Sequence, residues 1–179
     1  VGAAFAAERF GVTPDVITTA KGITNGAIPM GAVLVKGDVH AALMDGPPHA
    51  IELFHGYTYS GHPVAAAAGL ATLEAYRAER SFEAARRLEG AFAQRIHKLR
   101  GARHVVDVRN FGLMGAVELA PREDALGARG LEAHIRSFER GVVIRNAGDV
   151  LQFAPFLNGT EDEIEETFSI VEGVLNALA

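Results

Sequence analysis

A lysine between a short strand-like run and a glycine-rich loop is the feature of this chain best suited to chemistry. Lys21 follows the β-branched run at residues 16–19, and Gly22 starts the loop directly after it. A primary amine held in this way can bind a carbonyl group covalently. The chain has 3 lysines against 14 arginines, which weakly favours a chemical role for Lys21. Most lysines beside a glycine are solvated loop residues, so these residues alone leave both interpretations open.

A run of hydroxyl side chains forms a second candidate site. Tyr57, Thr58, Tyr59 and Ser60 precede Pro63, where we expect the first turn of a helix. Free amides and the helix dipole favour an anion at such a position, so a phosphate could bind there. The alternative is that Thr58 or Ser60 only caps the helix.

Arg145 is the third candidate, at the end of a predicted strand at 142–145 and before a turn at 146–149. A guanidinium group binds a carboxylate through two parallel hydrogen bonds. Gln152 lies on the predicted returning strand, 150–153, where it could face the same space. An ordinary surface ion pair is the alternative role for this arginine.

The sequence gives little evidence for other kinds of chemistry. The chain has no cysteine, which excludes disulfides and thiolate chemistry and fits a reducing cytoplasm. His55 and His62 do not have a standard metal-ligand spacing, so we expect no metal site. The nucleotide-binding and nucleophilic-serine glycine motifs are missing. A formal charge of −5 without a basic cluster argues against nucleic-acid binding, and no apolar run has the length of a membrane span.

The elements that must position these residues fall into two parts. Residues 1–80 are α/β in character, with buried strands expected at 16–19 and 32–35, a short helix near 39–44 and a helix from Pro63. Beyond residue 100 the pattern predicts a small α+β unit with strands at 105–108, 115–119, 142–145 and 150–153.

Three helices of the second part show an apolar face by their spacing. The helix at 81–100 should bury Phe82, Ala85, Leu88, Phe92, Ile96 and Leu99. The helix at 128–140 presents Leu131, Ile135 and Phe138. The last helix begins with a capping box at residues 160–163 and should bury Ile164, Phe168, Val171, Leu175 and Leu178.

The order of the three candidate sites is more specific than any one of them. Residues 19–33, Thr-Ala-Lys-Gly-Ile-Thr-Asn-Gly-Ala-Ile-Pro-Met-Gly-Ala-Val, resemble the cofactor-lysine segment of class III aminotransferases. Residues 51–63 resemble the second block of that family, and residues 145–149 resemble its R-x-x-G-D motif. The resemblance covers essentially the whole chain and points to the ω-amino acid, or β-alanine, pyruvate aminotransferases.

The resemblance implies a fold and an assembly. It implies the α/β class, as the C-terminal part of a fold-type I (aspartate-aminotransferase-like) enzyme. Residues 1–100 would be the C-terminal part of a large domain that binds pyridoxal 5′-phosphate (PLP), with the interdomain helix, and 101–179 a small α+β domain. Val1 stands where an initiator methionine would be, so we expect the chain to start within a larger protein.

The resemblance also implies roles. Lys21 would hold PLP as a Schiff base through a buried, partly desolvated amine and would move protons during transfer from an ω-amino donor to a 2-oxo acid such as pyruvate. Thr58 would bind the phosphate of the neighbouring subunit's cofactor in a homodimer or dimer of dimers. Arg145 would bind the substrate carboxylate, and Gln152 would contact the substrate.

Some parts of the family pattern lie upstream of Val1. They are a Gly-Ser phosphate turn, an aromatic residue over the cofactor ring and an aspartate for its nitrogen, so we expect the isolated 179 residues to be inactive. Ala154 stands where the family has the first of two prolines. The alternatives are another class III enzyme, of γ-aminobutyrate, ornithine or diaminopelargonate type, and a non-catalytic remnant of the fold.

Overall fold

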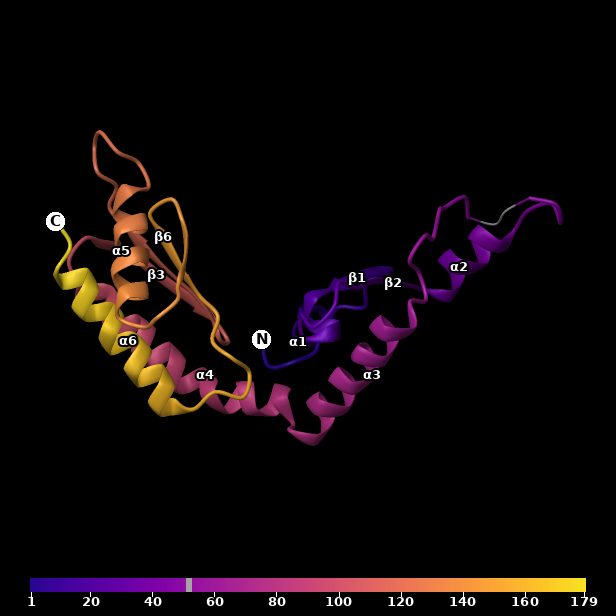
Figure 1. Ribbon diagram of the computed structural model, residues 1–179, viewed down its shortest axis with the longest axis horizontal. Helices are drawn as coiled ribbons and strands as arrows, with labels where there is room; N and C mark the ends of the chain where they lie inside the picture. The colour runs from indigo at the N-terminus through magenta and orange to yellow at the C-terminus, as the bar shows by residue number, and fades with distance from the viewer. Residues whose placement is uncertain (51–52) are drawn as a thin grey trace. The chain divides into compact units, whose positions relative to one another are not determined.

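The computed structural model describes residues 1–50 and 53–179, and these residues form two compact units (Figure 1). One unit, Phe10–Arg80, contains Lys21 and is called the lysine unit. The other combines Val1–Arg9 with Ser81–Ala179 and is called the hairpin unit. No helix of the described residues has the length and apolar character needed to cross a membrane.

A two-stranded antiparallel sheet forms the centre of the lysine unit. Strand β1 (Val16–Ala20) pairs with β2 (Gly31–Val35), so that Thr18 lies opposite Val33. A single 3₁₀ turn, η1 (Lys21–Thr24), follows β1 directly. Among the described residues, neither strand pairs with a third.

Two helices complete this unit, as the sequence predicts. They are α2 (Gly37–Met44) and α3 (Pro63–Ala78), and α3 begins at Pro63, where the missing amide hydrogen costs nothing. Helix α3 packs against η1 through a narrow face whose buried residues are Ala65, Gly69 and Thr72. Small side chains therefore bring the turn that carries Lys21 close to the backbone of this helix.

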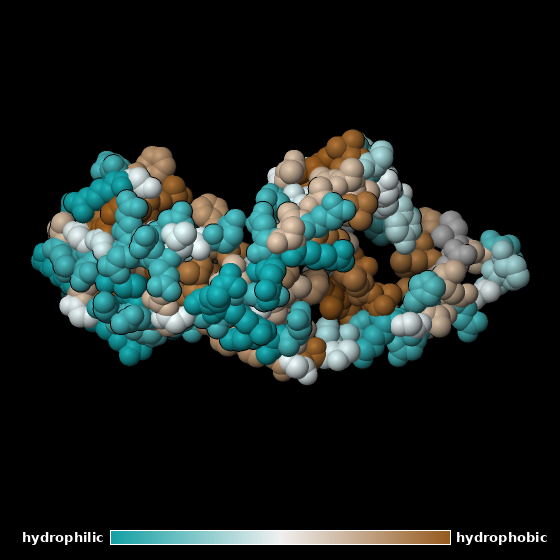
Figure 2. Space-filling model, turned by 90° about the horizontal axis from the view of Figure 1, so that it is seen from below, coloured by the Kyte–Doolittle hydropathy of each residue, from teal (hydrophilic) through white to brown (hydrophobic). Residues whose placement is uncertain are grey.

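The predicted burial of the two strands is wrong. In β1 exposed and half-buried residues alternate, and no residue of β2 is buried. Val33 and Leu34 expose 66% and 50% of their surface. Two paired strands have too few neighbours to cover their side chains, whereas the periodicity that predicted burial presumes further strands on both sides. Figure 2 shows hydrophobic residues, in brown, on the surface of the molecule.

The hairpin unit contains a four-stranded antiparallel sheet in the order β3-β4-β6-β5. Figure 1 shows helices α4, α5 and α6 beside this sheet. The elements of the unit, in chain order, are α1 (Ala6–Arg9), α4 (Ser81–Lys98), η2 (Leu99–Gly101), β3 (Val105–Phe111), β4 (Met114–Leu119), α5 (Ala128–Glu139), β5 (Arg145–Ala147), β6 (Val150–Phe153) and α6 (Glu161–Asn176). The strands expected at 105–108, 115–119 and 150–153 are confirmed. Of the strand expected at 142–145, only Arg145 belongs to β5.

The two faces of this sheet differ in character. Val108, Val117 and Leu151 lie opposite one another on three adjacent strands and are buried. They pack in the core with Phe92 of α4 and Phe168 of α6. Because side chains alternate along a strand, the neighbouring row faces away from this core. The core row thus fixes which face of the sheet holds the helices.

The predicted faces of α4 and α6 are confirmed. All five apolar residues predicted for the last helix are buried, including Leu178 just beyond α6. Of the six predicted for residues 81–100, five are buried, including Leu99 in η2, and Phe82 is half-buried. The capping box is also present. The backbone N–H of Glu163 donates to the Thr160 hydroxyl at 3.2 Å, and the Thr160 N–H donates to the Glu163 carboxylate at 2.8 Å.

The predicted face of α5 is wrong. Leu131, Ile135 and Phe138 are exposed, and the buried residues of the helix are Arg129, Gly130, Ala133 and Ser137. Small side chains let this opposite face approach β5, β6 and α6 closely. Close backbone approach therefore overrides the apolar stripe in setting the orientation of α5.

The compact units divide the chain between Arg80 and Ser81 and place Val1–Arg9 with the second unit. Helix α4 therefore belongs with the residues beyond 100, because its apolar face packs against α6 and β3. The assignment of residues 1–100 to a PLP-binding large domain and of 101–179 to a small domain stays a prediction.

Candidate active site

Lys21 lies at the point where β1 ends and the 3₁₀ turn begins. Its backbone has φ of 57°, in the left-handed region that residues with a side chain rarely adopt. Ala20 before it is fully extended, and Asn25 closes the turn with φ of 50°. The chain thus reverses direction at the lysine and does not continue the strand.

Two hydroxyl groups hold this turn. Thr24 is 1% exposed, and its hydroxyl donates to the carbonyl of Ile28 at 2.7 Å. The Tyr76 hydroxyl, from α3, donates to the carbonyl of Gly22 at 2.8 Å. The sequence interpretation missed both residues. A threonine three residues after the lysine was a visible signal, whereas nothing in the sequence links Tyr76 to a turn 54 residues earlier.

An open depression of about 650 Å³ lies beside the lysine turn, and none of the described residues that line it is acidic. Its walls come from the end of β1, the turn and the loop before β2: Ala20, Lys21, Thr24, Gly26, Ile28, Pro29, Met30 and Gly31. A primary amine at the edge of such a space can meet the aldehyde of a cofactor. The residues present therefore fit the aldehyde end of PLP, while the described part of the lining holds no carboxylate for its ring nitrogen.

The burial expected for the Lys21 amine is wrong in this structure, because the residue is exposed. In the part of the chain that the structure describes, the strand before the lysine pairs with one other strand, and α3 packs against the turn. Lys21 therefore lies at an open surface of the lysine unit.

The hydroxyl cluster is exposed and lies before α3. Backbone hydrogen bonds from Tyr59 and Ser60 to the Tyr57 carbonyl form a tight turn here. The cap of α3 is His62, whose Nδ1 accepts from the Ala65 N–H at 3.4 Å, so the alternative that Thr58 or Ser60 caps this helix is wrong. Thr58 itself is exposed. The beginning of this block, residues 51 and 52, lies outside the described residues.

Arg145 and Gln152 are brought together. They are direct partners in the β5–β6 pairing, so their side chains leave the sheet on the same face. Gln152 in turn lies opposite Ala116, and Ala116 opposite Arg109. This row alternates with the buried row of Val117, which puts Arg145 and Gln152 on the face away from the core.

Charge on this outer face is partly neutralised. Arg109 bridges two carboxylates, at 2.6 Å to Asp107 and 3.0 Å to Glu118. The Arg109 hydrogen bond lowers the pKa of Asp107, and the same two carboxylates raise the pKa of Arg109. Arg145 is exposed. In the described residues, no group of three or more histidine, aspartate or glutamate side chains could hold a metal ion.

Comparison with known proteins identifies the family to which this chain belongs. The family described as Aminotransferase class-III matches residues 1–175. The chain belongs to the class III aminotransferases. This confirms the resemblance to that family over nearly the whole chain.

Individual relatives of this class III aminotransferase chain are similar over nearly all of it. An omega-aminotransferase of Caulobacter vibrioides is 52% identical over 175 residues, which is 98% of this chain and 40% of the relative. The beta-alanine–pyruvate aminotransferase of Pseudomonas aeruginosa is 43% identical over 97% of this chain and 39% of its own length. The chain thus spans about two fifths of the length of these relatives.

Solved structures confirm the expected fold. An amine transaminase from an uncultivated Pseudomonas species, solved in its PLP-bound form, matches with a TM-score of 0.90 and 31% identity, covering 99% of this chain and 42% of that one. The class III aminotransferase chain therefore has the α/β class of fold-type I transaminases, as its sequence predicts.

Proposed function

We propose that this protein is a PLP-dependent transaminase that moves an amino group from an ω-amino acid or amine, such as β-alanine, to pyruvate. The observation that carries the proposal is the lysine turn: Lys21 follows a strand end and lines an open depression. It lies within residues 19–33, which resemble the cofactor-lysine segment of the family. The names of the two relatives, which are 52% and 43% identical to this chain, support the choice of donor and acceptor.

The pyridine ring of PLP, when bound, supplies a sink for the electrons of the bond that breaks at the donor carbon. Lys21 has two tasks: it holds the cofactor covalently, and its freed amine moves a proton at the donor carbon. The 3₁₀ turn serves both tasks, because the hydroxyls of Thr24 and Tyr76 hold the backbone that directly follows the lysine.

Arg145 and Gln152 bind the substrate in this proposal. The guanidinium group offers two parallel donors to a carboxylate, which both β-alanine and pyruvate carry. Gln152 lies beside it on the same face and adds one amide donor and one acceptor. Thr58 binds the cofactor phosphate of the neighbouring subunit in a homodimer or dimer of dimers.

A panel of amino donors tests the proposed substrates in the full-length protein. We expect β-alanine or another ω-amino donor with pyruvate to give the highest kcat/KM. Turnover that prefers 2-oxoglutarate with γ-aminobutyrate or ornithine, or the diaminopelargonate precursor as acceptor, would replace the proposal with another class III activity. No turnover with any pair would favour a non-catalytic remnant.

The isolated residues 1–179 provide a second test. We expect no transamination between β-alanine and pyruvate from this piece alone, because the depression beside Lys21 is open and its lining, among the residues that the structure describes, contains no carboxylate. Turnover by the purified piece at a rate similar to that of the full-length protein would contradict this expectation.

A further inference from the structure

The turn of the β5–β6 hairpin is held against the start of helix α5 by one carboxylate. Asp149 accepts a hydrogen bond from the Gly127 N–H at 2.7 Å and another from the Gly130 N–H at 2.9 Å, and each bond uses a different oxygen. The carbonyl of Asp149 accepts from the Leu119 N–H of β4 at 2.9 Å. One residue therefore joins the hairpin to a helix and to the neighbouring strand.

Helix α5 depends on this carboxylate for its N-terminal cap. The residue at the cap position, Gly127, has no side chain to offer its free amides. Helix α6, in contrast, is capped by its own Thr160. Asp149, 22 residues after Gly127, thus caps α5 as Thr160 caps α6. Its negative charge also interacts favourably with the positive end of the helix dipole.

The backbones at this joint fit closely. A Cβ atom on Gly130 would collide with the Gly148 carbonyl and lie 2.9 Å from the Asp149 Cα. Gly148 has φ of 59° at the first position of the two-residue turn, as in the type II′ turn that glycine favours. Glycines on both sides therefore allow the carboxylate to reach the helix amides.

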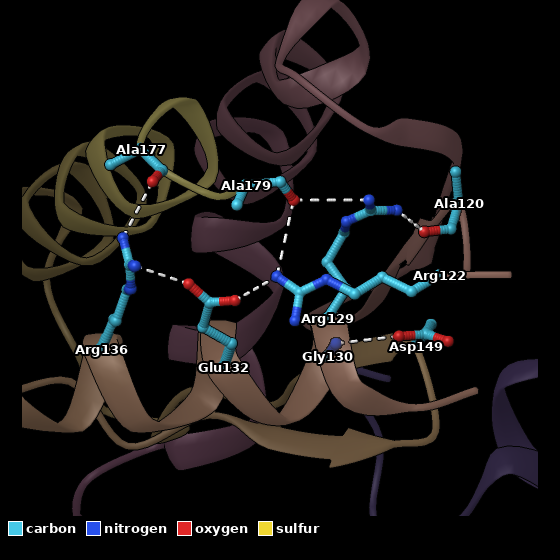
Figure 3. Close-up of polar contacts among 9 residues, drawn as sticks. All are labelled: Ala120, Arg122, Arg129, Gly130, Glu132, Arg136, Asp149, Ala177 and Ala179. Carbon is cyan, nitrogen blue, oxygen red and sulfur yellow. Dashed lines mark hydrogen bonds and ion pairs between the residues drawn. The ribbon is translucent and has the colours of Figure 1, made fainter. Parts of the chain in front are cut away.

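Helix α5 is in turn fixed to the rest of the hairpin unit (Figure 3). Arg129, which is 8% exposed, donates to the carbonyl of Ala120 just beyond β4. Arg136 donates to the Ala177 carbonyl just beyond α6, at 2.8 Å. Glu132 forms ion pairs with Arg136 and with Arg122. The hairpin is consequently docked on a helix that is held at several points along its length.

We propose that Asp149 is a positioning residue for Arg145: its carboxylate fixes the β5–β6 hairpin on α5 and thereby sets where the guanidinium group meets a substrate carboxylate. The inference rests on the proposed function, in which Arg145 binds that carboxylate. Arg145 stands at the start of a strand of only three residues and lies four positions before Asp149, so a shift of the turn moves the arginine as well.

The direct test is Asp149→Asn in the full-length protein, with KM and kcat measured for β-alanine and pyruvate. An asparagine keeps the size of the side chain but presents an NH₂ group to one of the two N–H donors, so one hydrogen bond is replaced by a clash of donors. We expect KM for both substrates to rise roughly tenfold, with kcat changed less than about threefold. A purely structural role would instead reduce the amount of active protein, lowering the apparent kcat at unchanged KM.

Two further variants separate positioning from loss of a helix cap. Thr160→Ala removes the side-chain cap of α6, whose hydrogen bonds join Thr160 to Glu163 outside the β5–β6 hairpin, and should leave KM unchanged. Gly130→Ala keeps both carboxylate oxygens but forces the hairpin away from α5, and it should raise KM as Asp149→Asn does. If Asp149→Asn does not fold, Gly130→Ala tests the same joint.

Arg145→Ala distinguishes failure of this inference from failure of the proposed function. A rise of KM in Arg145→Ala, together with unchanged KM in Asp149→Asn and Gly130→Ala, would overturn the positioning role alone. Unchanged KM in Arg145→Ala would overturn the carboxylate-binding role itself, and the inference with it. An equal rise in Thr160→Ala would also overturn the inference, because any lost cap would then have the same effect.

Discussion

At the scale of single residues, the backbone shapes the candidate site as much as the side chains do. Lys21 has a left-handed φ of 57°, a conformation that costs on the order of 1 kcal/mol or more for a residue with a side chain. The hydroxyls of Thr24 and Tyr76 bond to carbonyls of the same turn and loop and keep the lysine in this conformation. Strain of this kind often gathers at functional sites, which agrees with the role proposed for the lysine.

A second residue-scale feature is His104, just before β3, which makes stability depend on pH. Desolvation lowers its pKa from the ordinary 6.5, and the positive charges of Arg129, Arg103 and Arg122 lower it further. The unfolded chain therefore binds a proton more readily than the folded one. Stability from this source is complete above pH 6.5 and is lost as the pH falls through the folded-state pKa.

We predict that His104→Asn makes the stability of the protein less dependent on pH between about 7 and 5. Asparagine tolerates the left-handed backbone, φ of 64°, and does not titrate. Urea midpoints measured across this range would show the difference. An equally steep loss in the variant and the parent protein would show that other groups cause it.

At the scale of helices and strands, the sequence predicted the buried face of those helices whose apolar residues follow the helical period into the core. The apolar faces of α4 and α6 follow the helical period and meet each other in the core, so both were predictable. The face of α5 was not, because Gly130, Ala133 and Ser137 reveal close packing only when the partner is known. The burial of β1 and β2 failed for a related reason, since it depends on strands beside them.

The aromatic packing around α6 in the core of the hairpin unit can be tested by mutation. Phe168 of α6 is 2% exposed and contacts two rings, with centroids at 5.4 Å from Phe92 and 5.1 Å from Phe153. We expect Phe168→Ala to reduce the free energy of unfolding by about 3–5 kcal/mol because it leaves a cavity among these rings.

The matched control for this change is Phe156→Ala, which removes the same atoms from a residue that is 82% exposed. Its loss should stay below about 1 kcal/mol, in the range of surface substitutions. Denaturant unfolding of both variants measures the two values. Similar losses would mean that the described core does not carry the stability of this unit.

At the scale of the whole molecule, the candidate residues are shared between two units. Lys21 and Thr58 belong to the lysine unit, and Arg145 and Gln152 belong to the hairpin unit. The sequence placed Gln152 on a strand that returns after Arg145, where it could face the same space, and in the structure the two residues lie opposite each other in the β5–β6 pairing. It did not predict the docking role of Asp149, because the amides that this residue binds lie 19 and 22 positions away.

The proposed assembly predicts that two inactive variants restore each other. If Thr58 serves the neighbouring subunit, a dimer of one Lys21→Ala chain and one Thr58→Ala chain contains one complete site. Co-expression with different affinity tags, followed by isolation of mixed dimers, should give about half of the parent activity per dimer. If Thr58 serves its own subunit, mixed dimers would show no more activity than the Thr58→Ala protein itself.

The most direct test of the account is covalent trapping at Lys21. The full-length protein would be incubated with PLP, reduced with borohydride and digested, and the modified lysine would be identified by mass spectrometry. Lys36 and Lys98 serve as internal controls within this chain. We predict the reduced pyridoxyl group on Lys21 and its loss in Lys21→Arg. A cofactor fixed elsewhere, or no fixed cofactor in a folded protein, would contradict the assignment of this lysine.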